Sequence, residues 1–246
     1  MNDASSPTGG RPPSRVYAVL GMHRSGTSWL AGSLQEKGLE LGEVNEQATY
    51  NPKGNRESGT LAGIHEGVLR DSGGSWRDPP PQRRIRWSPR RLQALRLFIA
   101  SMNDRYDSWG FKDPRTVLLL EEWRREVPHD LRLVGIYRHP AAVARSLARR
   151  EPAIEAHAAE TLWKRYNSAL VDAHRRSSFP LLRFDVPAER LTAGVEHVAR
   201  RLGLPRVNEP STFFDKEFRR ADGTGDEHVP LRLRTTWRYL LAHTER

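Results

Sequence analysis

The chain has 246 residues, of which 37% are hydrophobic and 28% charged. This balance suits one α/β domain with a buried core and argues against a disordered chain. The net charge of +10 is carried mostly by arginine and suits an anionic ligand or partner, because the guanidinium fork matches phosphate and sulfate. The sequence has no cysteine. That excludes disulfides, thiolate metal sites and a cysteine nucleophile, and it agrees with a reducing cytoplasm.

The ends of the chain and its long-range pattern predict a single cytoplasmic domain. Residues 1–14 are rich in Ser, Gly and Pro and lack an apolar stretch, so we expect a disordered leader and no secretory signal. Residues 15–246 contain no internal repeat and no clear domain boundary. No run approaches the ~18 apolar residues of a membrane helix, so no transmembrane segment is expected.

Apolar runs and helical patterns alternate along the chain. The pattern predicts strands at 15–20, 109–112, 131–137 and 179–184, and helices at 25–37, 89–107, 116–125, 140–150, 156–176 and 188–202. Such alternation favours a three-layer α/β fold, with a central, mainly parallel sheet flanked by helices. Residues 71–90, which are rich in Gly, Pro and Arg, are expected to form a mobile loop.

The first predicted strand runs into a phosphate-binding motif. Residues 21–28, Gly-Met-His-Arg-Ser-Gly-Thr-Ser, match the frame G-x-x-x-x-G-K-[ST] except that Thr27 stands in place of the lysine. In NTPases that lysine reaches the β- and γ-phosphates, so its loss argues against ordinary ATP or GTP hydrolysis. A cation is still present at Arg24. The strand–turn–helix unit suits an anion, although a glycine-containing turn without a ligand is the alternative interpretation.

A second motif follows the third predicted strand. Arg138 leaves the carboxyl end of that strand and is placed to present a fork to a phosphate. Pro140 begins the next helix, where its missing N–H is harmless. Ser146 lies one to two turns into this helix and is placed to reach the same anion from beside it.

These two segments, in this order, resemble sulfotransferases that use 3'-phosphoadenosine-5'-phosphosulfate (PAPS). Residues 24–29, Arg-Ser-Gly-Thr-Ser-Trp, resemble the family's 5'-phosphosulfate loop P-K-S-G-T-T-W, with Arg24 replacing the lysine as in many bacterial members. Arg138, His139 and Ser146 resemble the 3'-phosphate motif, in which R-[ND]-P is followed by a serine eight residues after the arginine. His139 departs from the usual Asn or Asp.

The resemblance implies a P-loop NTPase-like sulfotransferase fold, PAPS as the donor and no required metal. It implies that Arg138 and Ser146 bind the 3'-phosphate and that Trp29 lies beside the adenine. It also implies that the 5'-phosphate is held by the amides of residues 24–28 and the hydroxyls of Thr27 and Ser28, that is, by Arg24, Ser25, Gly26, Thr27 and Ser28 together.

Weaker matches extend the resemblance to about residues 15–220. Residues 162–167, 180–185 and 202–204 resemble the W-x-x-Y-N, R-Y-E-D and F-L-G-L stretches of bacterial members. Phe184 takes the place of a tyrosine that contacts adenine in cytosolic members. Residues 213–220 resemble the family's C-terminal segment, so Arg219 and Arg220 are expected to close over the 3'-phosphate.

The same comparison suggests the catalytic groups. Arg24 would bridge the leaving phosphate and the sulfuryl oxygens, and Lys112 fits the family's second cation, unless it is a plain strand-end lysine. The histidine base of cytosolic members is missing. The segment 51–57, Asn-Pro-Lys-Gly-Asn-Arg-Glu, resembles N-P-x-G-x-x-E, so Glu57 is the candidate base, or else a helix-start residue paired with Arg56. Asp113 is the reserve, followed by His23 and His65.

Three other functions compete with this interpretation. A P-loop nucleotide kinase would use residues 180–185 as a Walker B strand, but it leaves Arg138 and Ser146 unexplained. A nucleic-acid-binding protein is suggested only by the arginines at 83–91, without a recognised motif. A nucleotide-binding pseudoenzyme would have lost its base. The acceptor is expected to be a carbohydrate, a glycolipid or a small metabolite. The charge of 83–91 favours an anionic or sugar-bearing one, and the oligomeric state is unreadable.

Overall fold

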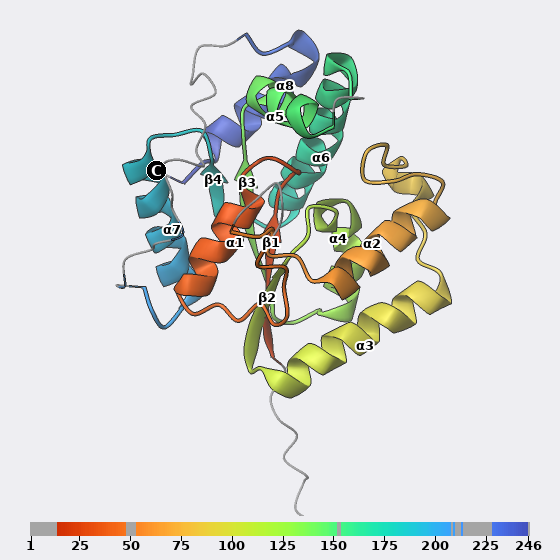
Figure 1. Ribbon diagram of the computed structural model, residues 1–246, viewed down its shortest axis with the longest axis vertical. Helices are drawn as coiled ribbons and strands as arrows, with labels where there is room; N and C mark the ends of the chain where they lie inside the picture. The colour runs from red at the N-terminus through yellow and green to blue at the C-terminus, as the bar shows by residue number, and fades with distance from the viewer. Residues whose placement is uncertain are drawn as a thin grey trace, which may run out of the picture.

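A four-stranded parallel sheet organises the chain, with its strands in the order β2-β1-β3-β4 (Figure 1). The strands are β1 (Arg15–Leu20), β2 (Ser108–Lys112), β3 (Leu131–Tyr137) and β4 (Leu181–Arg183). The computed structural model describes residues 14–47, 53–151, 154–207, 209, 213 and 228–245. The α/β class and the parallel sheet are therefore confirmed.

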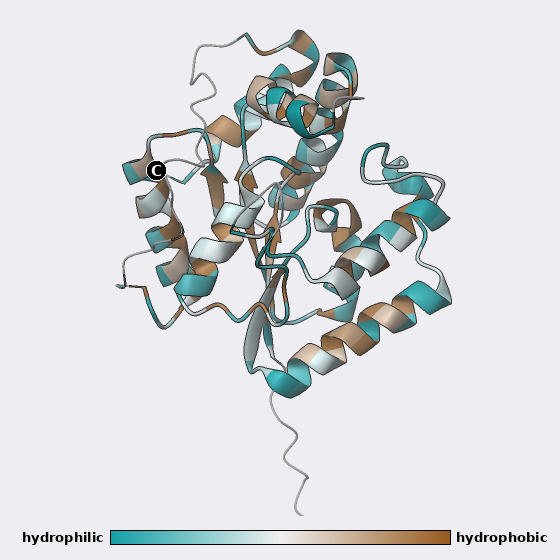
Figure 2. Ribbon diagram, in the orientation of Figure 1, coloured by the Kyte–Doolittle hydropathy of each residue, from teal (hydrophilic) through white to brown (hydrophobic). Residues whose placement is uncertain are grey.

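Helices cover both faces of the sheet because the side chains of each strand alternate between two cores. Val16, Ala18 and Leu20 of β1 belong to one apolar cluster, whereas Tyr17 and Val19 belong to the other. The second cluster lies under α1 (Thr27–Glu36) and α7 (Ala188–Leu202). The first cluster lies under α2 (Gly59–Asp71), α3 (Pro89–Arg105), α4 (Thr116–Glu126), α5 (Pro140–Arg150), α6 (Ala156–Arg176) and α8 (Leu231–Ala242). Figure 2 shows brown segments in β1 and β4 inside the fold and teal bands on the surrounding helices.

Most predicted elements match the observed ones, and three differ. β4 is shorter than the predicted strand 179–184, because Pro180 has no N–H to donate and only residues 181–183 pair with β3. α2 and α8 were not predicted. α2 carries glycines at 59, 63 and 67, which lower its intrinsic helix propensity, yet Leu61, Ile64 and Val68 bury an apolar stripe that stabilises it.

The segment between α2 and α3 is irregular apart from the short helix η1 (Gln82–Arg84). Three of its side chains, Trp76, Ile85 and Trp87, pack against the core. Ser75 also accepts from the backbone N–H groups of Arg77 and Asp78, which closes a tight turn. The predicted mobility of 71–90 stays a prediction.

A substitution at Gly135 in β3 tests how closely β4 and α6 pack against this strand. A Cβ atom there would lie 2.4 Å from Leu181 Cδ2 and 3.0 Å from Phe179 Cε2. We expect Gly135→Ala to lower the free energy of unfolding by about 1–3 kcal/mol through overpacking, measured by chemical denaturation. Gly63→Ala is the matched control: that residue is on the exposed side of α2, with no atom within 4 Å of the added methyl. It should stabilise the protein by about 0.5–1 kcal/mol. Equal stability of the two variants would contradict this packing.

Candidate functional site

The carboxyl ends of all four strands meet at one edge of the sheet, because the strands are parallel. The register pairs Val19 with Lys112 and Leu20 with Gly135. The segments that follow β1, β2 and β3 therefore begin side by side. Ligands bind at this edge in open α/β sheets, so the predicted phosphate segments lie at the expected place.

The turn after β1 is held in a conformation that exposes its amides. Arg24 and Gly26 both adopt positive φ, 65° and 91°. Gly26 is the residue before α1 and has no side chain to accept from the first-turn N–H groups, which leaves them for an anion. A Cβ on Gly26 would lie 2.2 Å from the Phe184 ring, and one on Gly21 would lie 2.3 Å from the carbonyl oxygen of Ile136. Glycine is required at both positions.

The two phosphate segments touch each other. Arg24 Nε donates to Ser146 Oγ over 3.0 Å, across 122 positions of sequence. Arg138 Nη1 donates to the carbonyl oxygen of Arg24 over 3.4 Å. The Arg138 guanidinium also lies over the Phe184 ring, 5.3 Å from its centroid. The structure therefore brings Arg24, Arg138, Ser146 and Phe184 together.

His139 has a structural role that explains its departure from Asn or Asp. It is the N-cap of α5, and its Nδ1 accepts from Ala141 N over 3.3 Å. Asn and Asp are preferred N-caps because their side-chain oxygens accept the same kind of bond, so the imidazole substitutes for them here. The carbonyl of Arg138 accepts from Trp163 Nε1 over 3.0 Å, which fixes the backbone just before this cap.

Trp29 lies on the first turn of α1, beside Phe184. Their ring centroids are 6.0 Å apart and tilted by 53°. Trp29 is half-buried and packs against the cluster under α1 and α7, so it has a core contact in addition to its place near the phosphate turn. Ser25 is fully buried and its amide donates to the Met22 carbonyl, which fixes the turn.

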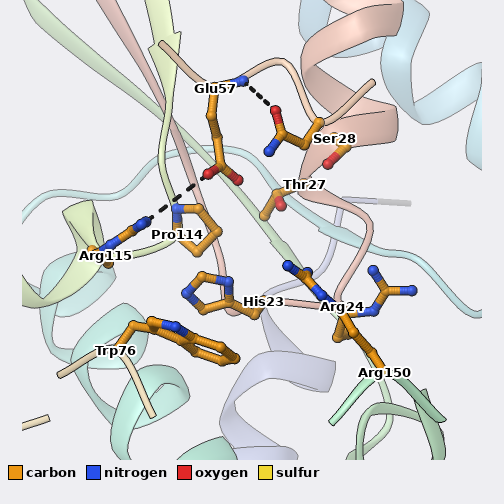
Figure 3. Close-up of a pocket in the computed structure, with 10 residues that line it drawn as sticks. His23, Arg24, Thr27, Ser28, Glu57, Trp76, Pro114, Arg115 and Arg150 are labelled. Carbon is orange, nitrogen blue, oxygen red and sulfur yellow. Dashed lines mark hydrogen bonds and ion pairs between the residues drawn. The ribbon is translucent and has the colours of Figure 1, made fainter. Parts of the chain in front are cut away.

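A cavity of about 100 Å³ opens beside the phosphate turn (Figure 3). It joins the turn to Glu57, and Figure 3 shows this carboxylate facing the same space as Thr27 and His23. Its lining residues come from five separate parts of the chain: His23, Arg24, Thr27, Ser28, Asn55, Glu57, Trp76, Pro114, Arg115 and Arg150. Three arginines and a single carboxylate line it, so the cavity is electropositive.

Glu57 is held by two cations. Lys112 Nζ donates to Glu57 Oε1 over 2.5 Å, and Arg115 Nη1 lies 3.9 Å from Oε2. The backbone N–H of Glu57 donates to Asn55 Oδ1 over 3.1 Å, which orients the loop. The Lys112 side chain is 1% exposed. Its burial lowers the pKa of Lys112 below the ordinary value, and the Glu57 charge opposes that shift.

The other candidate bases differ in access to the cavity. Asp113 is buried and accepts from Arg115 Nη1 over 2.9 Å. Burial by itself would raise the pKa of Asp113, but the His65 N–H that faces it, together with the charge and the backbone N–H of Arg115, holds it well below its usual range. His65 is fully buried and its Nε2 accepts from Trp123 Nε1. Because indole only donates, the ring proton of His65 lies on Nδ1, 3.3 Å from Asp113 Oδ2.

His23 is the one histidine among these candidates that lines the cavity. Its ring centroid lies 4.4 Å from that of Trp76 and 5.7 Å from that of Tyr166. Burial lowers the pKa of His23 well below the ordinary value, and the nearby Arg115 charge adds to this shift. The imidazole is therefore neutral near pH 7.

Sequence reasoning missed Trp76, Arg115 and Arg150 as cavity residues. Arg115 directly follows the Lys112-Asp113-Pro114 run, and that place after a strand end was the available signal. Trp76 and Arg150 lie at the cavity only because of tertiary packing. The predicted Arg219 and Arg220, and Asn51 and Pro52 of the Glu57 segment, lie outside the described residues.

The described ranges contain neither a metal-binding cluster nor a membrane-spanning helix. Within those ranges, no three His, Asp or Glu side chains gather closely enough to hold a metal ion. None of the helices in them has the length and apolar character needed to cross a bilayer.

Comparison with known proteins identifies the fold. No family model and no curated protein matches the sequence. Among solved structures, the chain is similar to the sulfotransferase domain of the olefin synthase from Synechococcus PCC 7002. The TM-score is 0.54 and the identity 14%, and the match covers 98% of each chain. The chain has a sulfotransferase fold.

At 14% identity the sulfotransferase fold is shared although most side chains differ. The two short sequence segments resemble motifs of sulfotransferases, and the fold of the whole chain resembles that of a sulfotransferase domain. The two observations agree. Within this fold, the described residues around the cavity include the turn before α1, three arginines and one carboxylate. Such a site can bind an anion and can accept a proton beside it.

The bond between Lys112 and Glu57 has a consequence for stability. Glu57→Gln removes the charge that faces a lysine buried to 1% exposure. We expect a loss of about 3 kcal/mol in the free energy of unfolding, because an uncompensated charge stays in the interior. Measurement is by chemical denaturation.

The double variant Glu57→Gln/Lys112→Met removes both charges. It should recover most of the lost stability, since replacing both members of a buried pair with uncharged groups is often neutral. Additive losses in the double variant would show that the pair does not interact as described.

Proposed function

We propose that this chain is a sulfotransferase that moves a sulfuryl group from PAPS to a hydroxyl or amine of an acceptor. The observation that carries the proposal is the hydrogen bond from Arg24 Nε to Ser146 Oγ. It joins two segments that independently resemble the 5'-phosphosulfate and 3'-phosphate motifs of the family. A nucleotide with phosphates at both positions fits a site that joins two such motifs, whereas ATP has no 3'-phosphate.

The donor side of the site would be formed by the turn after β1 and the start of α5. The amides of residues 24 and 26–28, with the hydroxyls of Thr27 and Ser28, would hold the 5'-phosphate at the N-terminus of α1, while the Ser25 amide donates to the Met22 carbonyl. Arg138 and Ser146 would hold the 3'-phosphate, because a guanidinium forms paired hydrogen bonds with a phosphate. The half-buried rings of Trp29 and Phe184 would flank the adenine. Arg219 and Arg220, which lie outside the described residues, stay predicted contacts of the 3'-phosphate.

The transfer step needs positioning, charge stabilisation and a base. The acceptor oxygen or nitrogen forms a bond to sulfur while the bond from sulfur to the 5'-phosphate oxygen breaks, and its electron pair leaves with adenosine 3',5'-bisphosphate. The acceptor's proton goes to the Glu57 carboxylate, which faces the cavity (Figure 3). Arg24 stabilises the charge on the leaving oxygen. The sulfuryl group carries less charge than a phosphoryl group, so these residues would not require a metal.

The competing functions account for fewer of these contacts. A P-loop kinase would use a lysine at the place of Thr27 and has no role for the pairing of Arg24 with Ser146. A pseudoenzyme without a base does not explain a carboxylate on the cavity wall. A nucleic-acid-binding role would rest on the exposed Arg83, Arg84 and Arg86 alone. Those arginines do not line the cavity, and we retain them as candidate contacts for an anionic or sugar-bearing acceptor.

The first test is calorimetric binding of adenosine 3',5'-bisphosphate, ADP and Mg-ATP. We expect tight binding of the bisphosphate without metal, and weaker binding of the two nucleotides that lack a 3'-phosphate. Arg138→Ala should weaken bisphosphate binding by about 10- to 100-fold, the range for a lost hydrogen bond to a charged group.

Arg132→Ala is the matched control for this experiment. Arg132 lies near the start of β3, whereas Arg138 directly follows its last residue; Arg132 is exposed and paired with Asp130, so bisphosphate affinity should not change. Preference for Mg-ATP, or equal affinity in the Arg138→Ala and wild-type proteins, would reject PAPS as the donor and favour the kinase alternative.

A further inference from the structure

The cavity has a second arginine, Arg115, that the sequence resemblance does not assign to any role. It lies directly before α4 and enters the cavity from the side opposite Arg24 (Figure 3). Lys112, the expected second cation, does not line the cavity in the described part of the chain and donates instead to Glu57. The group that faces the cavity from the end of β2 is therefore the guanidinium of Arg115.

Three carboxylates hold this guanidinium in one orientation. Arg115 Nη1 donates to Asp113 Oδ1 over 2.9 Å, and Nε donates to Glu66 Oε2 over 3.1 Å. The third is Glu57, 3.9 Å from Nη1. The backbone N–H of Arg115 also donates to Asp113 Oδ1 over 2.8 Å, so one carboxylate fixes both the main chain and the side chain.

These bonds use two of the three guanidinium nitrogens of Arg115. Nε donates to Glu66 and Nη1 donates to Asp113, whereas Nη2 donates to no residue that the structure describes. The Arg115 side chain is only 10% exposed, so its orientation is set by the fold rather than by solvent. Burial opposes its charge, yet the carboxylates of Asp113, Glu57 and Glu66 raise the pKa of Arg115 above its ordinary value. Arg115 is a preorganised hydrogen-bond donor at the edge of the cavity.

We propose that Arg115 is the second catalytic cation, donating from its guanidinium to an oxygen of the transferred sulfuryl group while Lys112 serves Glu57. The inference rests on the proposed function, since it names a further residue for the same reaction. Charge spreads over the equatorial sulfuryl oxygens in a loose transition state, as in phosphoryl transfer. A fixed donor stabilises that charge without reorganisation, and the carboxylates behind Arg115 supply that fixity.

The experiment compares Arg115→Met and Arg115→Lys with wild type, using PAPS itself. Transfer to water, followed as release of sulfate, requires no identified acceptor. We expect Arg115→Met to lower the rate constant by about 100-fold, the effect of removing one preorganised donor. Its affinity for adenosine 3',5'-bisphosphate, which lacks the sulfuryl group, should stay within about threefold of wild type, well under the tenfold that 1.4 kcal/mol gives. Arg115→Lys should recover part of the rate, because it keeps the charge but loses the planar fork.

Arg125→Met is the matched control. It lies in the last turn of α4, 71% exposed and paired with Glu122, and should leave both the rate and the affinities unchanged. Should turnover with water be too slow to follow, the ratio of PAPS to bisphosphate affinity decides: Arg115→Met should lower it, and an unchanged ratio would overturn the proposal.

Other outcomes distinguish a failure of the proposed role of Arg115 from a failure of the proposed sulfotransferase function. A wild-type rate in Arg115→Met, or a parallel loss of PAPS and bisphosphate affinity, rejects a contact with the sulfuryl group and reduces Arg115 to a structural role. A wild-type protein that binds neither PAPS nor the bisphosphate rejects the proposed function itself. Arg115→Lys keeps the cation among its three carboxylates, so it reports on the proposal even where Arg115→Met fails to fold.

Discussion

The parallel pairing of β1 with both β2 and β3 is the constraint on which the site depends. Val19 pairs with Lys112, and Leu20 pairs with Gly135. Because all three strands run the same way, residues that are far apart in sequence leave the sheet at one edge. Gly21 and Gly135 make the close approach possible at this edge: each would place a Cβ atom within 2.4 Å of a neighbouring strand or its connection. A different strand order would separate Arg24 from Ser146.

Charge around the cavity is arranged in two parts. Arg24 lies in the turn after β1, just before the N-terminus of α1. The backbone N–H groups and the helix dipole at this terminus add to the positive field of Arg24. Near the end of β2, the cations Lys112 and Arg115 are bonded to Glu57, Asp113 and Glu66. The first part is therefore suited to an anion and the second part is internally compensated. The two ends of the cavity therefore differ in charge, and an anionic group is favoured at the end beside the N-terminus of α1.

A buried row of polar groups behind Arg115 fixes the geometry at the β2 end of the cavity. Asp113 binds the backbone and side chain of Arg115, and its other oxygen faces His65. His65 in turn accepts from Trp123, whose ring stacks on Phe111 with centroids 3.9 Å apart. The orientation of a cavity arginine is thus tied to the aromatic core between the sheet and α4. Buried polar groups that are bonded in this way rigidify their surroundings.

The sequence by itself predicted the strands, the parallel sheet and six of the eight α-helices in the part of the chain that the structure describes, and it singled out the two segments at the carboxyl edge of the sheet. These features depend on local patterns: apolar runs, helix periodicity and the glycines and proline at turns. It did not predict α2, because glycine-rich helices are stabilised by packing rather than by propensity, nor α8, which buries Leu233 and Leu240 against α6. The bond between Arg24 and Ser146, the pairing of Lys112 with Glu57, and the presence of Trp76, Arg115 and Arg150 at the cavity were decided by tertiary structure alone. The bonds in this set join residues 49 to 122 positions apart, and contacts at such separations leave no periodic signal in the sequence. Trp76 and Arg150 reach the cavity only through packing.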